Sequence, residues 1–256
     1  MHIFALHGFT GRGCDFHAIA DFIGGAWHCP DLPGHGPNPL LECSPEASIK
    51  FIDDEISRCI YPSTKSLKIL LGYSMGARAA MQHVFTNHAA WDALVLVSPQ
   101  PGIEDNLKLL ARQESDAVLE EKIMRDGVPK FIEFWQQKAL IQSQKKIPPE
   151  WRTVMQAARE EHTQKGLAMS LRQFGQGRCP NLWPRLKDLK LPTLLITGEQ
   201  DTQYTKIAQN FASKVCLGYE SGRFQRAIIK GAGHAPHLEF PEMTAKIIKD
   251  FIININ

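Results

Sequence analysis

One serine lies where an apolar stretch passes directly into helix-forming residues. In residues 68–80, KILLGYSMGARAA, the pentapeptide 72–76 matches the pattern G-x-S-x-G around Ser74. Glycines permit a turn so tight that a side chain at either flank would strike the neighbouring strand or helix. Such a turn strains the serine and presents its hydroxyl above a sheet. The pattern predicts that Ser74 is a nucleophile or a base, although an idle serine in a tight strand–helix turn would also fit it.

A serine hydroxyl becomes reactive when a histidine accepts its proton, and that histidine needs an acid to fix its tautomer. Asp201 follows the apolar run LLITG, and His234 follows the next apolar run in the loop GAGH. Because parallel strands end at one edge of a sheet, we expect both side chains to lie beside Ser74. His237 competes with His234 for the role of base, and Glu199 is a weaker alternative to Asp201.

A third element is the segment HGFTG, residues 7–11, which follows another short apolar run. A loop in this position can aim a backbone N–H at a developing oxyanion. We expect the amides of Phe9 and Met75 to form this oxyanion hole. His7 is interpreted as a structural hydrogen-bonding residue. The histidines interpreted as packing or surface residues are His28, His83 and His88.

The segments around these residues alternate between apolar strands and amphipathic helices. In residues 45–60, for example, Ile49, Ile52 and Ile56 share one helical face, and Ser44 can cap the helix. This alternation predicts an α/β fold, with a mostly parallel sheet covered by helices on both faces. The other expected strands and helices lie in segments 3–8, 26–36, 67–73, 75–88, 91–98, 191–199, 226–234 and 242–256.

Residues 102–190 interrupt the alternation, because they contain no convincing strand and are typical of helices. A helical insertion between two strands of a parallel sheet is most simply a lid over the edge where the strands end. We therefore predict a core formed by residues 1–101 and 191–256 and a lid formed by residues 102–190. The aromatic residues of this lid include Phe131, Phe134, Trp135, Trp151, Phe174 and Trp183.

Composition limits the class of protein. The chain of 256 residues, 43% of them hydrophobic, fits one large domain or a core with a lid, and its formal net charge of +2 indicates neither a nucleic-acid nor a membrane partner. Its six cysteines form no C-x-x-C pair and have no histidines at zinc-finger spacing, so neither a metal site nor a disulfide framework is expected. The amino-terminal sequence lacks a basic start and a cleavable apolar region, which predicts a cytoplasmic protein.

The segments HGFTG, DLPGHG, GYSMGA, GEQD and GAGH occur in the order found in the α/β-hydrolase superfamily, which this chain resembles outside the lid. More narrowly, LVSPQPG, LLARQESD, FIEFWQQ, KGLAMSLRQFGQGRCPNLWPRL and HLEFP resemble the 2-succinyl-6-hydroxy-2,4-cyclohexadiene-1-carboxylate synthases of menaquinone biosynthesis. This resemblance implies a lyase without a cofactor. It would remove pyruvate from 2-succinyl-5-enolpyruvyl-6-hydroxy-3-cyclohexene-1-carboxylate, with Ser74 abstracting a ring proton that His234 relays.

A substrate with several carboxylates needs guanidinium groups, because arginine binds carboxylates bidentately and keeps its charge. Arg78 lies one helical turn after Ser74 and can face the pocket, and Arg112 matches an arginine position of the synthases. Arg159 is the third arginine expected at the substrate, and Arg172 competes with it.

The sequence departs from the pattern of the synthases at two places. The synthases have tryptophan followed by tyrosine in the lid, where this chain has Phe134 and Trp135, and their S-x-x-P-G-L segment is SPQPG here. We expect Phe134 and Trp135 at the substrate nonetheless. Tyr73, inside the serine turn, matches a tyrosine that contacts the substrate in the synthases.

The same serine, acid and histidine also serve acyl transfer, so a carboxylesterase, a thioesterase and a C–C bond hydrolase stay open as alternatives. The expected arginines favour the lyase. A non-catalytic binding protein is the remaining alternative, and the intact serine, acid, histidine and glycines disfavour it. We expect a monomer or a weak homo-oligomer that binds a small anionic substrate.

Overall fold

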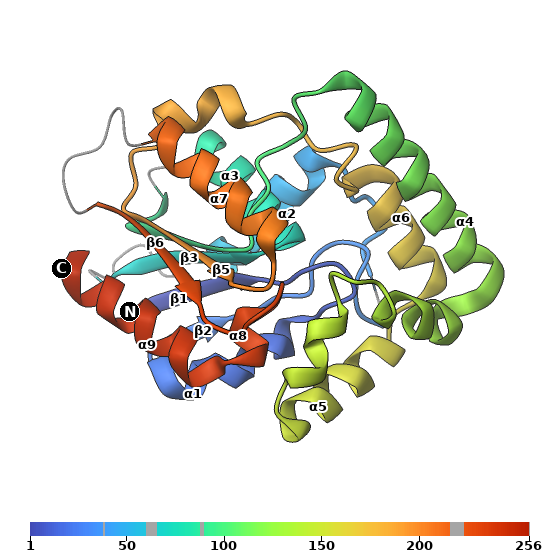
Figure 1. Ribbon diagram of the computed structural model, residues 1–256, viewed down its shortest axis with the longest axis horizontal. Coiled ribbons are helices and arrows are strands. Elements are labelled where there is room, and N and C mark those ends of the chain that lie inside the picture. The colour runs from blue at the N-terminus through green and yellow to red at the C-terminus, as the bar shows by residue number, and fades with distance from the viewer. Residues whose placement is uncertain (38, 60–65, 88–89, 216–222, 256) are drawn as a thin grey trace.

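The computed structural model describes residues 1–37, 39–59, 66–87, 90–215 and 223–255. Six parallel strands form one sheet in the order β2-β1-β3-β4-β5-β6, with helices on both faces (Figure 1). The predicted parallel α/β fold is thereby confirmed. The strands are β1 (His2–Leu6), β2 (Ala26–His28), β3 (Lys68–Tyr73), β4 (Ala93–Val97), β5 (Thr193–Gly198) and β6 (Phe224–Ile229).

Two sets of helices cover the sheet, because consecutive side chains of a strand point to opposite faces. Phe4 and Leu6 pack with α2 (Pro45–Cys59), α3 (Met75–Thr86) and α7 (Thr202–Val215). The intervening Ile3 and Ala5 pack against the other set, α1 (His17–Ile23) and α9 (Pro241–Ile255). Both faces of each central strand are therefore buried, which explains why these strands read as continuous apolar runs.

The segment between β4 and β5 is helical. Its elements are α4 (Asn106–Gln136), η3 (Gln142–Lys146), α5 (Pro149–Glu160), α6 (Gln164–Phe174) and η4 (Trp183–Asp188). Helices α4 and α6 share an apolar cluster that includes Ile123, Phe131 and Leu167. They lie on the side of the molecule toward which the strands run (Figure 1). Trp183 and Leu186 of η4 instead join the cluster on the α3 face, so the end of this segment packs with the core helices.

Two local features follow from single residues. Helix α4 is kinked at Gly127, whose φ of 79° and ψ of 168° are non-helical, and Pro129 follows the kink. The amide of Ala47 donates to Ser44 Oγ over 3.2 Å, which is the predicted cap of α2. The remaining short helices are η1 (Gly13–Phe16) and α8 (Pro236–Glu239).

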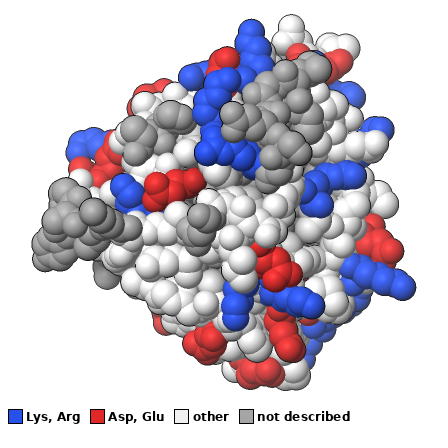
Figure 2. Space-filling view, turned by 90° about the vertical axis from the view of Figure 1, so that its left-hand side faces the viewer, with Lys and Arg blue, Asp and Glu red and all other residues white. Residues whose placement is uncertain are grey.

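The surface where the strands begin carries basic and acidic side chains in mixed order, with several basic ones near its upper edge (Figure 2). Within the described ranges, no helix combines the length and the apolar character that crossing a membrane requires. The cysteines that the structure describes are free thiols: Cys14, Cys29, Cys43, Cys59 and Cys179. The sixth, Cys216, lies outside the described residues.

Candidate active site

The serine turn joins β3 directly to α3. Ser74 has a φ of 50° and a ψ of −104°, a conformation that side chains rarely adopt. A Cβ added to Gly76 would lie 1.9 Å from the Leu6 carbonyl oxygen, and one added to Gly72 would lie 2.5 Å from the Gly76 carbonyl oxygen. Both positions therefore require glycine. The turn lifts Ser74 Oγ out of the sheet at the edge where the strands end.

Ser74, His234 and Asp201 are hydrogen-bonded in series. The Ser74 hydroxyl donates to His234 Nε2 over 3.0 Å, and His234 Nδ1–H donates to Asp201 Oδ2 over 2.6 Å. His234 and Asp201 are both buried. The Tyr204 amide donates to the other oxygen of Asp201 over 3.1 Å and so fixes the carboxylate. In this arrangement Nε2 of the imidazole can accept the serine proton while the acid stabilises the imidazolium.

The competing histidine and acid lie elsewhere. His237 is fully buried, its ring lies 4.4 Å from that of Tyr73, and neither of its nitrogens has a hydrogen-bond partner in the described structure. Burial lowers its pKa to about 3, so the imidazole is neutral. Glu199 accepts a hydrogen bond from the Gly231 amide over 2.9 Å and holds the turn after β6. The structure brings neither to Ser74.

The other histidines have structural partners. His7 Nδ1–H donates to the Gly8 carbonyl oxygen, and its Nε2 accepts from the Leu32 amide over 2.9 Å. Burial lowers the pKa of His7 to about 4, which keeps it neutral in this bridging role. His83 lies between Asp53 and the Trp91 indole. His28 stacks on His2 at the edge of the sheet, and His88 lies outside the described residues.

The loop after β1 faces the serine. The Met75 amide is the first of α3, and neither it nor the Phe9 amide donates a hydrogen bond within the described part of the chain. Both amides are therefore free to donate, and their role as an oxyanion hole stays a prediction. Thr10 has a φ of 62°, and His162 Nε2–H donates to its carbonyl oxygen over 3.1 Å. A residue from the inserted helices therefore holds this strained loop.

The triad opens into a cavity of roughly 800 Å³, including its mouth, that lies between the core and the inserted helices. Side chains from both parts line it. From the core they are Phe9, Asp15, Tyr73, Ser74, Met75, Arg78, Tyr204, His234 and Leu238; from the inserted helices they are Arg112, Trp135, Leu140, Ile141, Gln144, Arg159, Ser170, Leu171, Phe174 and Gln176.

Comparison with known proteins decides the family. Residues 3–247 match the model of the alpha/beta hydrolase family. The chain belongs to the alpha/beta hydrolase family.

Several relatives of the chain carry the name of one synthase. A putative 2-succinyl-6-hydroxy-2,4-cyclohexadiene-1-carboxylate synthase of Bacillus subtilis is 30% identical over 99% of this chain and 90% of its own length. The synthase of Serratia proteamaculans is 24% identical over 97% of this chain and 92% of its own. The solved structure of MenH from S. aureus is 27% identical, covers 100% of this chain and 94% of that one, and has a TM-score of 0.88. The resemblance that the sequence indicates is thereby confirmed.

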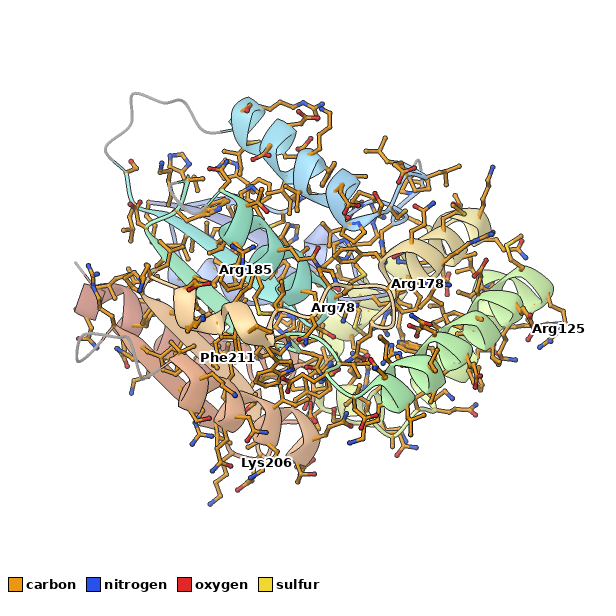
Figure 3. All side chains as sticks on the ribbon, turned by 90° about the horizontal axis from the view of Figure 1, so that it is seen from above. Arg78, Arg125, Arg178, Arg185, Lys206 and Phe211 are labelled. Carbon is orange, nitrogen blue, oxygen red and sulfur yellow. The ribbon has the colours of Figure 1, made fainter. Side chains whose placement is uncertain are left out.

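Arg78 is the buried arginine that the core of this alpha/beta hydrolase contributes to the cavity. It lies in the middle of the molecule, whereas Arg125 extends outward from α4 at the periphery (Figure 3). Its Nη2 donates to the Phe174 carbonyl oxygen over a long 3.4 Å, and the guanidinium lies 5.9 Å from the Phe174 ring centroid. Its Nε is buried and has no partner among the described residues. Arg78 therefore lines the cavity with a guanidinium that the described residues satisfy only in part.

Arg112 enters the cavity from α4. Its Nε donates to Asp116 over 2.7 Å, and its Nη1 donates to Gln176 Oε1. Asp116 is buried and also accepts from the Gly177 amide over 3.1 Å. Asp116 and Gln176 therefore orient Arg112, and sequence reasoning did not anticipate either of them.

Arg159 is 3% exposed and lies at the end of α5. Nη2 donates to Gln144 Oε1 over 3.0 Å, while Nε and Nη1 are buried without a partner in the described chain. Burial lowers its pKa, and the nearby Asp15 opposes that effect. Arg172, the alternative, is exposed and lies 3.9 Å from Glu120 on the outer surface. The structure therefore places Arg159, and not Arg172, at the cavity.

The predicted aromatic pair separates. Trp135 lines the cavity and packs edge-on against Phe9, with ring centroids 5.4 Å apart. Phe134 points away, with the ammonium groups of Lys122 and Lys138 lying 4.6 and 4.4 Å from its ring centroid. The expectation that Phe134 contacts the substrate is corrected accordingly: adjacent residues of a helix face different directions, and only one of this pair can face the cavity. Tyr73 lines the cavity beside His234.

Residues that sequence reasoning missed include a buried acid. Asp15 lines the cavity from η1, and burial raises its pKa to about 6. Its only signal in the sequence is its place four residues after the HGFTG loop. Within the described residues, no group of three or more histidine, cysteine, aspartate or glutamate side chains is arranged to hold a metal ion.

Proposed function

We propose that this alpha/beta hydrolase is a lyase that eliminates pyruvate from 2-succinyl-5-enolpyruvyl-6-hydroxy-3-cyclohexene-1-carboxylate. The observation that carries the proposal is the presence, beside a complete triad, of two buried guanidiniums with unpaired N–H groups. Burying such a cation without a partner is costly, so the site is built to receive an anion. Relatives named for this synthase reaction support the assignment.

The arginines suit a substrate with separated carboxylates because they form two groups. Arg78 donates to the Phe174 carbonyl oxygen and Arg112 to Gln176, so both lie near the end of α6. Arg159 donates to Gln144 in η3. The substrate proposed here carries carboxylates on its ring, its succinyl chain and its enolpyruvyl group. Bidentate binding of more than one of them would fix the ring against the triad.

The reaction begins with a proton transfer. His234 Nε2 accepts the proton of Ser74 Oγ, and the resulting alkoxide takes the proton from ring carbon 2, which is acidic because it lies next to the succinyl carbonyl. The electron pair of that C–H bond first forms an enolate with the succinyl carbonyl and then becomes the C2–C3 double bond. The former C3–C4 double bond moves to C4–C5, and the C5–O bond breaks. The departing enolpyruvate receives the proton held by the His234 imidazolium and becomes pyruvate, so the triad returns to its starting state and atoms and charges balance.

Negative charge accumulates on the succinyl carbonyl oxygen before the C5–O bond breaks. The amides of Phe9 and Met75 are placed to donate to that oxygen, as in the oxyanion holes of acyl transfer. Donors fixed in advance stabilise the charge without reorganising during the reaction. The same machinery would serve ester hydrolysis, so the triad and the hole cannot decide between lyase and hydrolase.

Direct turnover tests the proposal. We expect the purified protein to release pyruvate from the enolpyruvyl substrate, measured by coupling to lactate dehydrogenase and NADH oxidation. A p-nitrophenyl ester supplies the competing reaction, which we expect to be slow or absent. Rapid ester cleavage without pyruvate release would instead assign a carboxylesterase or thioesterase, and would leave the fold and triad unchanged.

A further inference from the structure

Asp15 is an acid in a cavity whose other charged lining groups are mainly arginines. It is 6% exposed, and its Oδ2 accepts a hydrogen bond from the Arg12 amide over 3.2 Å. A Cβ at Gly11 would lie 2.6 Å from that oxygen, so the carboxylate packs closely against this loop. Its Oδ1 is buried and receives no hydrogen bond from any described residue. One lone-pair-bearing oxygen of a buried acid is thus left without a donor.

Arg159 lines the same cavity and has hydrogen-bond donors that lack acceptors among the described residues. Two of its nitrogens, Nε and Nη1, are buried without acceptors in the described structure, while its Nη2 is held by Gln144. Arg159 is the strongest charge acting on Asp15, yet the hydrogen bonds of each side chain go to other residues. The side chains that carry these unpaired donors and this unpaired acceptor line the same cavity, and no hydrogen bond joins them in the described structure.

The chemistry of these groups selects one kind of ligand. A carboxylate can accept from an unpaired N–H group of Arg159, as proposed above, but it has no hydrogen to donate to Asp15 Oδ1. An ether or a carbonyl oxygen could accept from Arg159 but has no hydrogen for Asp15. A hydroxyl is both donor and acceptor. It can accept from the guanidinium of Arg159 and donate to Asp15 Oδ1, which pairs all of the groups.

We propose that Asp15 and Arg159 form a hydroxyl-binding subsite, and that Asp15 makes this enzyme selective for ligands with a ring hydroxyl. The proposal rests on the function proposed above, since the 6-hydroxyl of that substrate and of its product would occupy the subsite. Asp15 acts through binding and takes no part in the proton transfers of the triad. Its selectivity comes from the cost of leaving a buried acceptor unpaired when the hydroxyl is absent.

Two ligands isolate the hydroxyl. The product, 2-succinyl-6-hydroxy-2,4-cyclohexadiene-1-carboxylate, carries it; 2-succinylbenzoate, which is the product after loss of water, keeps both carboxylates and lacks it. Calorimetric binding of each to wild type, Asp15→Asn and Asp15→Ala gives three affinity ratios. Each ratio divides the affinity for the product by the affinity for 2-succinylbenzoate. The two ligands also differ in ring shape, but that difference enters the ratio of every variant and cancels when the ratios are compared.

We expect both substitutions to lower the preference for the hydroxylated ligand by about tenfold or more, as a lost hydrogen bond to a charged group implies. Affinity for 2-succinylbenzoate should stay the same or rise.

Asp31→Ala is the matched control. Asp31 also supports this loop, through Arg12 and the Gly13 amide, but does not line the cavity. Asp31→Ala should lower the affinity for both ligands equally. If Asp15 had only a structural role, its variants would show the same equal loss.

The outcomes separate the two proposals. An unchanged ratio in both Asp15 variants, with pyruvate release by the wild type, overturns the hydroxyl subsite and leaves the lyase. A wild type that releases no pyruvate and binds neither ligand overturns both. Asp15→Asn retains the size of the side chain, so the ratio can be measured even if Asp15→Ala fails to fold.

Discussion

The triad and the arginines line the same cavity but differ in how completely their own surroundings satisfy them. Ser74, His234 and Asp201 form a closed series of hydrogen bonds, and the second oxygen of Asp201 is also paired. Arg78 and Arg159 keep buried N–H groups without partners in the described chain. The triad side chains are therefore positioned without a ligand, whereas N–H groups of the two arginines lack acceptors in the described chain until a ligand binds.

This difference reflects where the residues originate. The triad lies on the sheet edge, where strand ends and steric exclusion at two glycines fix it. Arg112 and Arg159 come from the segment between β4 and β5, and their partners Gln176 and Gln144 come from the same segment. The geometry of the triad should accordingly be insensitive to changes in the arginines. Substrate affinity, by contrast, should depend on each arginine and on the acid beside Arg159.

The largest effect is expected from the triad. Ser74→Ala should lower kcat/KM for pyruvate release by about 10³-fold or more, because the serine and histidine act as a unit. His234→Ala should cost about as much, and the double variant no more than either single variant. Asp201→Asn should cost as much or less, since its role is orienting and electrostatic. Retained product binding and an unchanged melting temperature are the controls, and near-normal turnover by Ser74→Ala would remove the serine from the mechanism.

A smaller, selective effect is expected from the arginines. Arg78→Ala and Arg112→Ala should each lower kcat/KM for the polyanionic substrate by roughly 2 kcal/mol or more of transition-state stabilisation, as removal of one partner of a charged hydrogen bond implies. Any cleavage of a small neutral ester should remain unchanged. Arg125→Ala is the matched control, because Arg125 lies on the same helix as Arg112 but is exposed and paired with Asp126. Equal losses on both substrates would indicate a folding defect instead.

Asp15 should affect stability in the direction opposite to its effect on binding. Burial raises its pKa from 3.8 to about 6, so at pH 7 the folded protein holds a charge that is more favourable in the unfolded chain. Asp15→Asn should therefore be more stable by about 2 to 3 kcal/mol at pH 7, since each pKa unit corresponds to about 1.4 kcal/mol.

The pH dependence gives the control. Between pH 4 and 6 the folded wild type binds a proton at Asp15 that the unfolded chain does not, so its stability falls as pH rises through this window. The advantage of Asp15→Asn should shrink as the pH is lowered from 7 to 4, measured by urea unfolding at each pH. An advantage that is independent of pH would show that the charge of Asp15 is not its cause.

The smallest effect is expected from the second histidine. His237 is buried, packs against Tyr73 and Phe16, and has both nitrogens unpaired in the described structure. His237→Phe keeps an aromatic ring and removes the unsatisfied polar atoms, so the free energy of unfolding should rise by about 1 kcal/mol. Turnover should stay within about threefold of wild type. A loss comparable to that of His234→Ala would make His237 the base.

The sequence alone is sufficient to predict the fold, and it also places Ser74, Asp201 and His234 close to strand ends. Continuous apolar runs followed by amphipathic helices allow few arrangements other than a parallel sheet with two covered faces. Gly72 and Gly76 mark the serine turn because the backbone there excludes a Cβ. Short stretches of the sequence determine the local sterics and the order of the strands. Residues near the strand ends can therefore be predicted without the tertiary structure.

The lid residues depended on the tertiary structure. Phe134 and Trp135 are equally aromatic in the sequence, and only the rotation of α4 determines that Trp135 faces the cavity while Phe134 lies beside two lysines. Asp15 gave no signal stronger than its place near a loop, because its burial and its missing partner arise from packing between η1 and α5. Segments far apart in the chain create such an environment, and no local pattern records which side chains they leave unpaired.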